Sequence, residues 1–421
     1  MNKKNSKRKQ RKEDKEKVNK ISDVKMAYIM YGKKVFVIPI VIAIILGAVI
    51  WGIVYNARKN NAPQESADNQ KEQINYIWGE IKPGKKNANN FTTVTSSDGI
   101  QVPVPTGYTA SSASDENSVN GGFVIYEGTE AVTDSNKWEA QCNRNQYVWI
   151  PIADVSDMYW RNQTTGKKYG TWYNFDKSAT TYAKGANHSY EPQTTKHDIQ
   201  STYLTKYLNG MSREDFLMEM EIDFDKMLNS VATYGGYYIG RYETGDLSQA
   251  TPVIKRINTD IDAQNWWQKW KKARKLSGTS VGVQMIWGIQ WDETLKWLID
   301  TGEKTYAEIA SDSTSWGNYR NNSFTYYTNT SKSTATKKSY NSTIIPSGAY
   351  EGANANNIFD LAGNAFKWTL ESNGSGASDK RSRRSGTENN YGNEYCAAYR
   401  GSYYPFSNYS YMSLRCTLFI K

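Results

Sequence analysis

The sequence predicts an α+β domain with long irregular loops, preceded by one transmembrane helix. Residues 366–371 alternate between apolar and polar side chains, which is the period of a strand with one buried face. Residues 212–228 place Phe and Met side chains at spacings of four, four and three, which forms one face of a helix. Residues 35–55 contain no charged side chain, and about 20 such residues cross a bilayer.

The N-terminal tail, residues 1–34, holds most of the net charge. It carries thirteen Lys and Arg against four Asp and Glu, so it contributes +9 of the total +10 and leaves about +1 for the other 387 residues. The tail has no apolar period long enough for a core, which predicts a disordered cytoplasmic topology signal, with anionic-lipid binding as the alternative. The nearly neutral remainder has no basic field, so we expect no nucleic-acid partner.

The apolar run at residues 35–55 predicts a retained membrane helix in contact with membrane lipid. A cleaved signal peptide is the competing interpretation, but the run is long for a signal sequence and no convincing cleavage site follows it. The basic residues lie on its N-terminal side, which predicts a cytoplasmic N-terminus and a C-terminal domain outside the cell. The predicted localisation is a single-pass protein of the cell membrane.

A polar linker or stalk is expected at residues 56–90, followed by one extracellular domain at residues 91–421. The first half of this domain shows short β-type runs bounded by turn residues and long polar segments. Strands are expected within residues 100–105, 122–126 and 145–152, and loops at 153–205 and 303–345.

The second half of the domain is predicted to contain three helices and a central strand. Ser212 is the expected N-cap of the first helix. Arg241 and Glu243 lie two residues apart in the strand, on one face, which predicts an ion pair between them. The expected elements are helices at residues 212–228, 262–275 and 287–298, and the strand within 235–245.

Residues 357–371 form the most distinctive segment. One helical turn is predicted from the short apolar spacing of Ile358, Phe359, Leu361 and Ala362. Gly363 and Asn364, which follow, are the residue types that best tolerate a positive φ. The segment reads NIFDLAGNAFKWTLE. It resembles the N-(I/V)-x-D-(L/M)-x-G-N-(V/A)-x-E-W-(T/S) block of the formylglycine-generating enzyme family, also called sulfatase-modifying-factor domains.

Three further blocks extend the resemblance over residues 235–421. GGYYIGRYETG, at 235–245, is similar to the family's F-x-I-G-x-Y-E-V-T block. Residues 284–298 correspond in position to the family's R-L-P-T-E-A-E-W-E segment and share its acidic, aromatic helical character, but the Arg-Leu-Pro-Thr residues are missing. RGSY, at 400–403, is similar to R-G-G-S-(W/Y). The resemblance implies a C-type-lectin-like fold.

The cysteines depart from the pattern of the family. Its copper-dependent oxidases use two cysteines shortly after R-G-G-S-(W/Y), because a thiolate pair binds Cu(I). Residues 400–415 contain no cysteine. The chain has Cys142, Cys396 and Cys416, and the last two lie on either side of this stretch. A Cys396–Cys416 disulfide is predicted, with free buried thiols as the alternative.

No cofactor is expected, with calcium at the Gly363–Asn364 corner as the alternative. The resemblance implies a calcium site at this corner, but Lys367 stands where the family has Glu, and an ammonium group cannot ligate calcium. His188 and His197 are predicted surface residues of a polar loop rather than metal ligands. The basic residues of 380–384 are likewise predicted to lie in a solvated loop, with an anion-binding role as the alternative.

The C-terminal end carries the predicted ligand-binding site. Seven tyrosines lie between positions 391 and 411, interleaved with Asn and Ser. Tyr supplies a large contact area with few torsions to freeze, and Ser and Asn supply adaptable hydrogen bonds. Tyrosines that pack inward are the alternative. The predicted ligand-binding residues are Tyr403, Tyr404, Asn408, Tyr409 and Tyr411.

Together these features predict a membrane-anchored extracellular protein that binds an unknown protein or glycan ligand without formylglycine-generating activity. Two alternatives remain open. One is an extracellular metal-dependent oxidoreductase with an atypical site, and the other is a structural component of a surface assembly.

Overall fold

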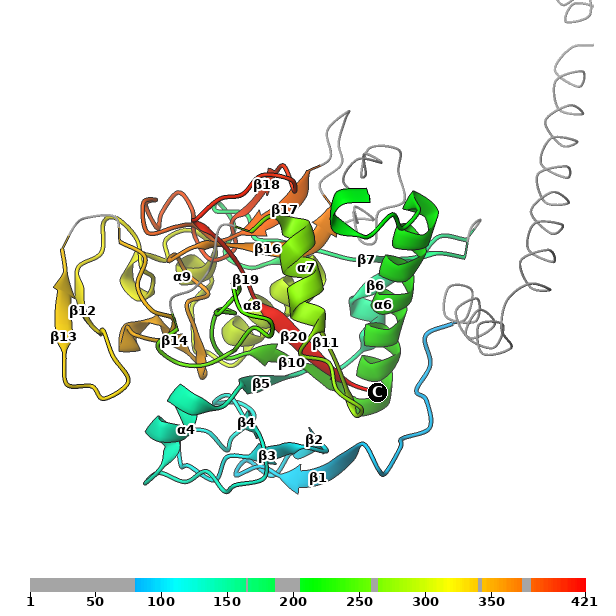
Figure 1. Cartoon of the computed structure of the whole chain (residues 1–421), viewed down its shortest axis with the longest axis horizontal. Helices are drawn as coiled ribbons and strands as arrows, with labels where there is room; N and C mark the ends of the chain where they lie inside the picture. The colour runs from blue at the N-terminus through cyan, green and yellow to red at the C-terminus, as the bar shows by residue number, and fades with distance from the viewer. Residues whose placement is uncertain (1–79, 164–165, 186–204, 259–263, 340–342, 373–379) are drawn as a thin grey trace, which may run out of the picture. The chain divides into compact units, whose positions relative to one another are not determined.

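The computed structural model describes residues 80–421, apart from 164–165, 186–204, 259–263, 340–342 and 373–379. The fold below belongs to the unit that spans Asn75–Lys421 (Figure 1). Its architecture is α+β, and strands and loops make up most of it.

The core is a curled, antiparallel six-stranded sheet with the order β11-β20-β10-β5-β4-β3. Its centre is rich in aromatic and branched residues, which suit a pleated surface covered on both sides. Tyr238 of β10 lies opposite Trp149 of β5 and Leu418 of β20. Helix α6 packs against β10 and β20, and the apolar stripe of this helix closes one face of the sheet (Figure 1).

A second, four-stranded sheet has the order β18-β17-β16-β19, in which β16 and β19 are parallel. This sheet positions the candidate site. The elements are β1 (Phe91–Thr95), β2 (Gln101–Pro105), β3 (Tyr108–Ala110), β4 (Val124–Glu127), α4 (Lys137–Asn143), β5 (Gln146–Pro151), η1 (Val155–Asp157), β6 (Tyr159–Arg161), β7 (Lys168–Gly170), β8 (Tyr173–Asn174), β9 (Ala183–Lys184), α6 (Arg213–Tyr234), β10 (Gly236–Gly240), α7 (Trp266–Arg274), β11 (Val281–Met285), α8 (Gly288–Asp300), α9 (Tyr306–Ala310), η2 (Thr314–Trp316), β12 (Phe324–Tyr327), β13 (Ala335–Lys338), η3 (Glu351–Ala353), β14 (Asn354–Ala355), β15 (Ile358–Phe359), β16 (Phe366–Ser372), β17 (Arg381–Arg384), β18 (Arg400–Tyr403), β19 (Met412–Leu414) and β20 (Cys416–Ile420).

The transmembrane helix of the predicted architecture is contradicted. Within the described ranges, every helix is too short or too polar to cross a bilayer. The apolar run at 35–55, on which the prediction rested, lies outside the described residues, as do residues 1–34 and most of the predicted linker at 56–90. The single-pass topology and the cell-membrane localisation are not retained.

Local signals located the long helix correctly. The Ser212 hydroxyl accepts a hydrogen bond from the Asp215 amide at 3.0 Å, which satisfies one of the free amides at the start of α6. The helix continues beyond the expected end at residue 228 and stops at Gly235, whose φ of 84° is the left-handed conformation common at helix C-termini.

The corner at Gly363 and Asn364 has the predicted positive φ values, 69° and 63°. A Cβ atom at Gly363 would lie 2.4 Å from the Asn318 carbonyl oxygen, so this position also needs glycine for space. The helical turn predicted for residues 358–362 is wrong. Ile358 and Phe359 instead form the short strand β15, and Asp360 adopts a φ of 58°.

Two burial predictions fail on the second sheet. Strand β16 is buried on both faces, because its polar residues Lys367, Thr369 and Glu371 meet charged and polar partners inside the domain. The basic residues predicted to lie in a solvated loop form β17, in which Arg381 and Arg384 are buried. Both exceptions are part of the charge networks described below.

Candidate functional site

The predicted ligand-binding residues lie on β18 and on the turn that connects it to β19. The rings of Tyr403 and Tyr409 pack edge to face with centroids 4.8 Å apart, and Tyr409 and Tyr411 are 5.2 Å apart. Tyr404 is 39% exposed and Asn408 is also exposed, whereas the other three tyrosines are partly buried against the core. We call these five residues the tyrosine face. The structure therefore brings the four predicted tyrosines into one surface cluster.

Two cations complete the tyrosine face. The Arg383 guanidinium lies 3.8 Å from the ring centroid of Phe366 and 5.0 Å from that of Tyr403. The Lys380 ammonium lies 5.2 Å from the centroid of Tyr404. In the described part of the chain neither cation forms an ion pair with a carboxylate. Only the Tyr404 ring of these three is exposed, so Lys380 and the partly exposed Arg383 lie at the edge of the cluster, where an anionic group of a ligand could reach them.

The other face of the same sheet carries a buried network of two carboxylates and two guanidinium groups. Asp292 binds Arg384 at 2.8 Å and Arg400 at 2.5 Å, using one oxygen for each. Glu371 binds the same two arginines at 2.9 and 3.2 Å. The charges balance, and the quartet links β17 and β18 to α8 through charge-assisted hydrogen bonds.

A second buried network surrounds the Gly363–Asn364 corner. The Lys367 ammonium lies 3.0 Å from a Glu243 oxygen and donates to the Gly363 carbonyl at 2.5 Å. The Asn364 amide donates to the other Glu243 oxygen at 2.6 Å. Burial lowers the pKa of Lys367, and the nearby Glu243 charge opposes that shift. Lys367 and Asn364 thus occupy both oxygens of the Glu243 carboxylate.

The predicted Arg241–Glu243 ion pair is wrong. Arg241 instead binds Glu116 at 2.6 Å, and Glu243 binds Lys367. Glu243, Lys367 and Arg241 are all essentially inaccessible to solvent. These charges are therefore buried and paired, and they connect segments that are distant in sequence.

The predicted Cys396–Cys416 disulfide is also wrong, because all three cysteines are free thiols. The Cys396 thiol donates to the Ala310 carbonyl at 3.2 Å, whereas the Cys416 sulfur accepts from the Thr244 hydroxyl at 3.3 Å. Burial raises the pKa of Cys416 to about 12, so this thiol is unreactive at neutral pH.

The histidines His188 and His197 lie outside the described residues. Within the described ranges, no three His, Cys, Asp or Glu side chains are grouped so that they could hold a metal ion.

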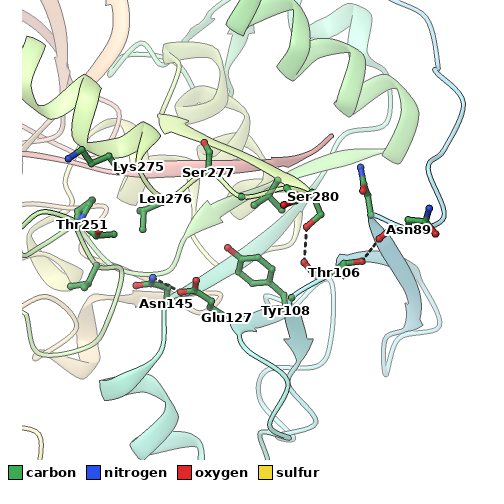
Figure 2. A pocket seen from close by; sticks show the side chains of 17 residues that line it. Asn89, Thr106, Tyr108, Glu127, Asn145, Thr251, Lys275, Leu276, Ser277 and Ser280 are labelled. Carbon is green, nitrogen blue, oxygen red and sulfur yellow. Dashed lines mark hydrogen bonds between the residues drawn. The ribbon is translucent and has the colours of Figure 1, made fainter.

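Sequence reasoning missed two pockets. A pocket of about 600 Å³ is lined by turn and loop residues distant in sequence, among them Thr106, Asn145 and Ser277 (Figure 2). The only local signal for it was the run of Ser, Gly and Thr at 277–280, after the predicted helix 262–275. A smaller pocket of about 260 Å³ lies beside Arg384 and Arg400 of the quartet.

Comparison with protein-family models finds no family that matches the chain, and comparison with curated proteins finds no match either. The resemblance to sulfatase-modifying-factor domains therefore stays a prediction from the quoted motifs.

Proposed function

We propose that this domain binds a protein partner through the tyrosine face, without catalysing a reaction there. The observation that carries the proposal is a partly exposed aromatic cluster with two cations that have no carboxylate partner in the described part of the chain. Tyr404 and Asn408 are exposed, and Arg383 and Lys380 lie against Tyr403 and Tyr404.

The chemistry of this surface favours a partner with apolar and acidic side chains. Tyr and Arg are the residue types that most often dominate the energy of protein interfaces. The edge-to-face packing of Tyr403 on Tyr409 fixes ring positions before binding, so less side-chain freedom is lost on association. Carboxylates of a partner would meet Arg383 and Lys380 at the edge of the aromatic cluster.

The absence of cysteine between residues 400 and 415 supports binding rather than copper-dependent oxidation at this place. In this proposal the scaffold is like that of the sulfatase-modifying-factor domains, and the 357–371 block serves the fold. The alternative, an oxidoreductase with an atypical metal site, makes a different prediction. It requires stoichiometric copper or iron in the purified protein, which elemental analysis measures.

The test uses the full chain as bait for a displayed library of short random peptides. We expect selected peptides to be enriched in acidic and aromatic residues, and Tyr404→Ala and Tyr409→Ala each to weaken their binding about tenfold or more. Tyr391→Ala is the matched control, because Tyr391 is 42% exposed but lies outside the tyrosine face. Selected peptides whose binding is unaffected by both face variants would contradict the proposal.

A further inference from the structure

The larger pocket lies between the two edge strands of the six-stranded sheet. Tyr108 of β3 and Val281 of β11, from opposite ends of the strand order, both line it. The Ser280 hydroxyl donates to the Thr106 carbonyl at 2.8 Å and joins the two edges at one side of the pocket (Figure 2). The curled sheet is therefore nearly closed here, and the remaining gap forms a cavity like the mouth of a barrel.

The lining of this pocket mixes polar and apolar surface in about equal shares and carries few charges. Hydroxyl and amide side chains come from the turn before β3, from the start of β5 and from the loop between α7 and β11. Glu127 and Lys275 are the charged residues among the 17 that line it. This mixed lining lacks the continuous apolar walls that a lipid chain needs, and its single lysine falls short of the several cations that a phosphorylated ligand needs.

Three side chains form the centre of the pocket. The ring of Tyr108 projects into it between the Glu127–Asn145 pair and the Ser280–Thr106 contact (Figure 2). The Asn145 side chain is 8% exposed and held in place, because its Oδ1 atom accepts a hydrogen bond from the Ile254 backbone amide at 2.7 Å. Its amide donates to one Glu127 oxygen at 2.6 Å. The other oxygen of the exposed Glu127 has no hydrogen-bond partner within the described ranges.

We propose that this pocket binds a neutral saccharide. A sugar ring presents a flat C–H face, which fits the Tyr108 ring, and hydroxyls that need acceptors and donors at its rim. The free Glu127 oxygen accepts from a sugar hydroxyl, and Thr251 brings a further hydroxyl to the lining of the same cavity. A hydrogen bond to a charged acceptor contributes more than a neutral one, so Glu127 is the expected specificity residue.

The site is independent of the tyrosine face, so the two proposals fail separately. The experiment screens the full chain on an array of neutral and acidic glycans and then titrates the best neutral sugar by calorimetry. We expect Glu127→Gln to weaken binding about tenfold, because the neutral amide is a poorer acceptor of the same size. Tyr108→Phe keeps the ring and should have a smaller effect, whereas Tyr108→Ala should abolish binding.

Glu130→Gln is the matched control, since Glu130 is an exposed carboxylate a few residues away and does not line the pocket. Tyr404→Ala should leave sugar binding unchanged. Circular dichroism of each variant establishes that it is folded, and Glu127 is exposed, so loss of the fold is not expected there. Binding of no neutral glycan, a preference for acidic glycans, or equal affinity of Glu127→Gln and the unaltered protein would overturn the proposal.

Discussion

The Gly363–Asn364 corner and the tyrosine face lie at the same four-stranded sheet, but they differ in whether their charged side chains are buried and paired. At the corner, Lys367 is inaccessible to solvent and paired with Glu243. At the tyrosine face, Arg383 is partly exposed and lies on aromatic rings without an ion-pair partner in the described part of the chain. A buried, paired charge contributes to the unique fold, whereas a half-exposed, unpaired charge is available to a partner.

The largest effect is expected when the pair at the corner is broken. Lys367→Ala leaves the buried Glu243 carboxylate without its cation, which should lower the free energy of unfolding by about 3–5 kcal/mol. Urea denaturation measures the change. Lys380→Ala, at the tyrosine face, is the control and should change stability by less than about 0.5 kcal/mol. Equal stability of the two variants would remove the distinction drawn between the regions.

A pH effect of the next size is expected near the quartet. Burial raises the pKa of Glu293 from 4.5 to about 7, and the Tyr173 hydroxyl donates to this carboxyl group at 3.0 Å. The folded state thus keeps a proton that the unfolded state has already lost. The resulting stability is fully present below about pH 4.5 and is lost as the pH rises to about 7.

Glu293→Gln should remove this loss, which is on the order of 3 kcal/mol between the two pH values. Denaturant midpoints of both proteins across the pH range provide the measurement, and Glu130→Gln serves as the exposed control. A parallel pH dependence of Glu293→Gln and the unaltered protein would show that Glu293 ionises alike in both states.

A smaller loss is expected from the backbone of the corner. Gly363→Ala combines a positive φ with a Cβ atom 2.4 Å from the Asn318 carbonyl oxygen, and should destabilise the domain by about 2 kcal/mol or more. Gly302→Ala isolates the conformational part, because Gly302 has a φ of 75° and no atom within 4 Å of the added carbon. It should cost about 1 kcal/mol. Thermal unfolding compares them, and a greater loss for Gly302→Ala would argue against a tight corner.

The smallest effect on stability is expected at the tyrosine face itself. Tyr404→Ala removes an exposed ring and should change the free energy of unfolding by less than about 0.5 kcal/mol. Peptide binding by Tyr404→Ala, in contrast, should weaken markedly. This variant therefore loses binding without losing stability, whereas Lys367→Ala loses stability. A large loss of stability in Tyr404→Ala would assign the ring to the core instead.

Elements with local causes were predictable from the sequence. Ser212 caps α6, and Gly363 and Asn364 form their corner because cap chemistry and positive φ depend on a few neighbouring residues. Burial of the polar face of β16 was not predictable. Lys367 is buried because Glu243, which is distant in sequence, meets it in the fold, and no local pattern encodes that encounter.

The same limit applies to the candidate sites. Composition was enough to name Tyr403 and Tyr409 as candidate ligand-binding residues, but not to show that their rings pack against each other. It could not show that Arg383 lies against Tyr403, because the expected solvated loop is a strand paired with β18. The pocket around Tyr108 joins loops from both ends of a curled sheet, so its composition becomes apparent only once the strand order is known.

The place of β20 inside the main sheet, between β11 and β10, has a consequence for biosynthesis. Tyr238 of β10 pairs with Leu418 of β20, and about half of the domain's sequence is translated between them. Until β20 is made, β10 has one unpaired edge and β11 lacks its partner. The nascent chain therefore exposes an aromatic strand edge for much of its synthesis, which is the condition under which chaperone binding or aggregation competes with folding.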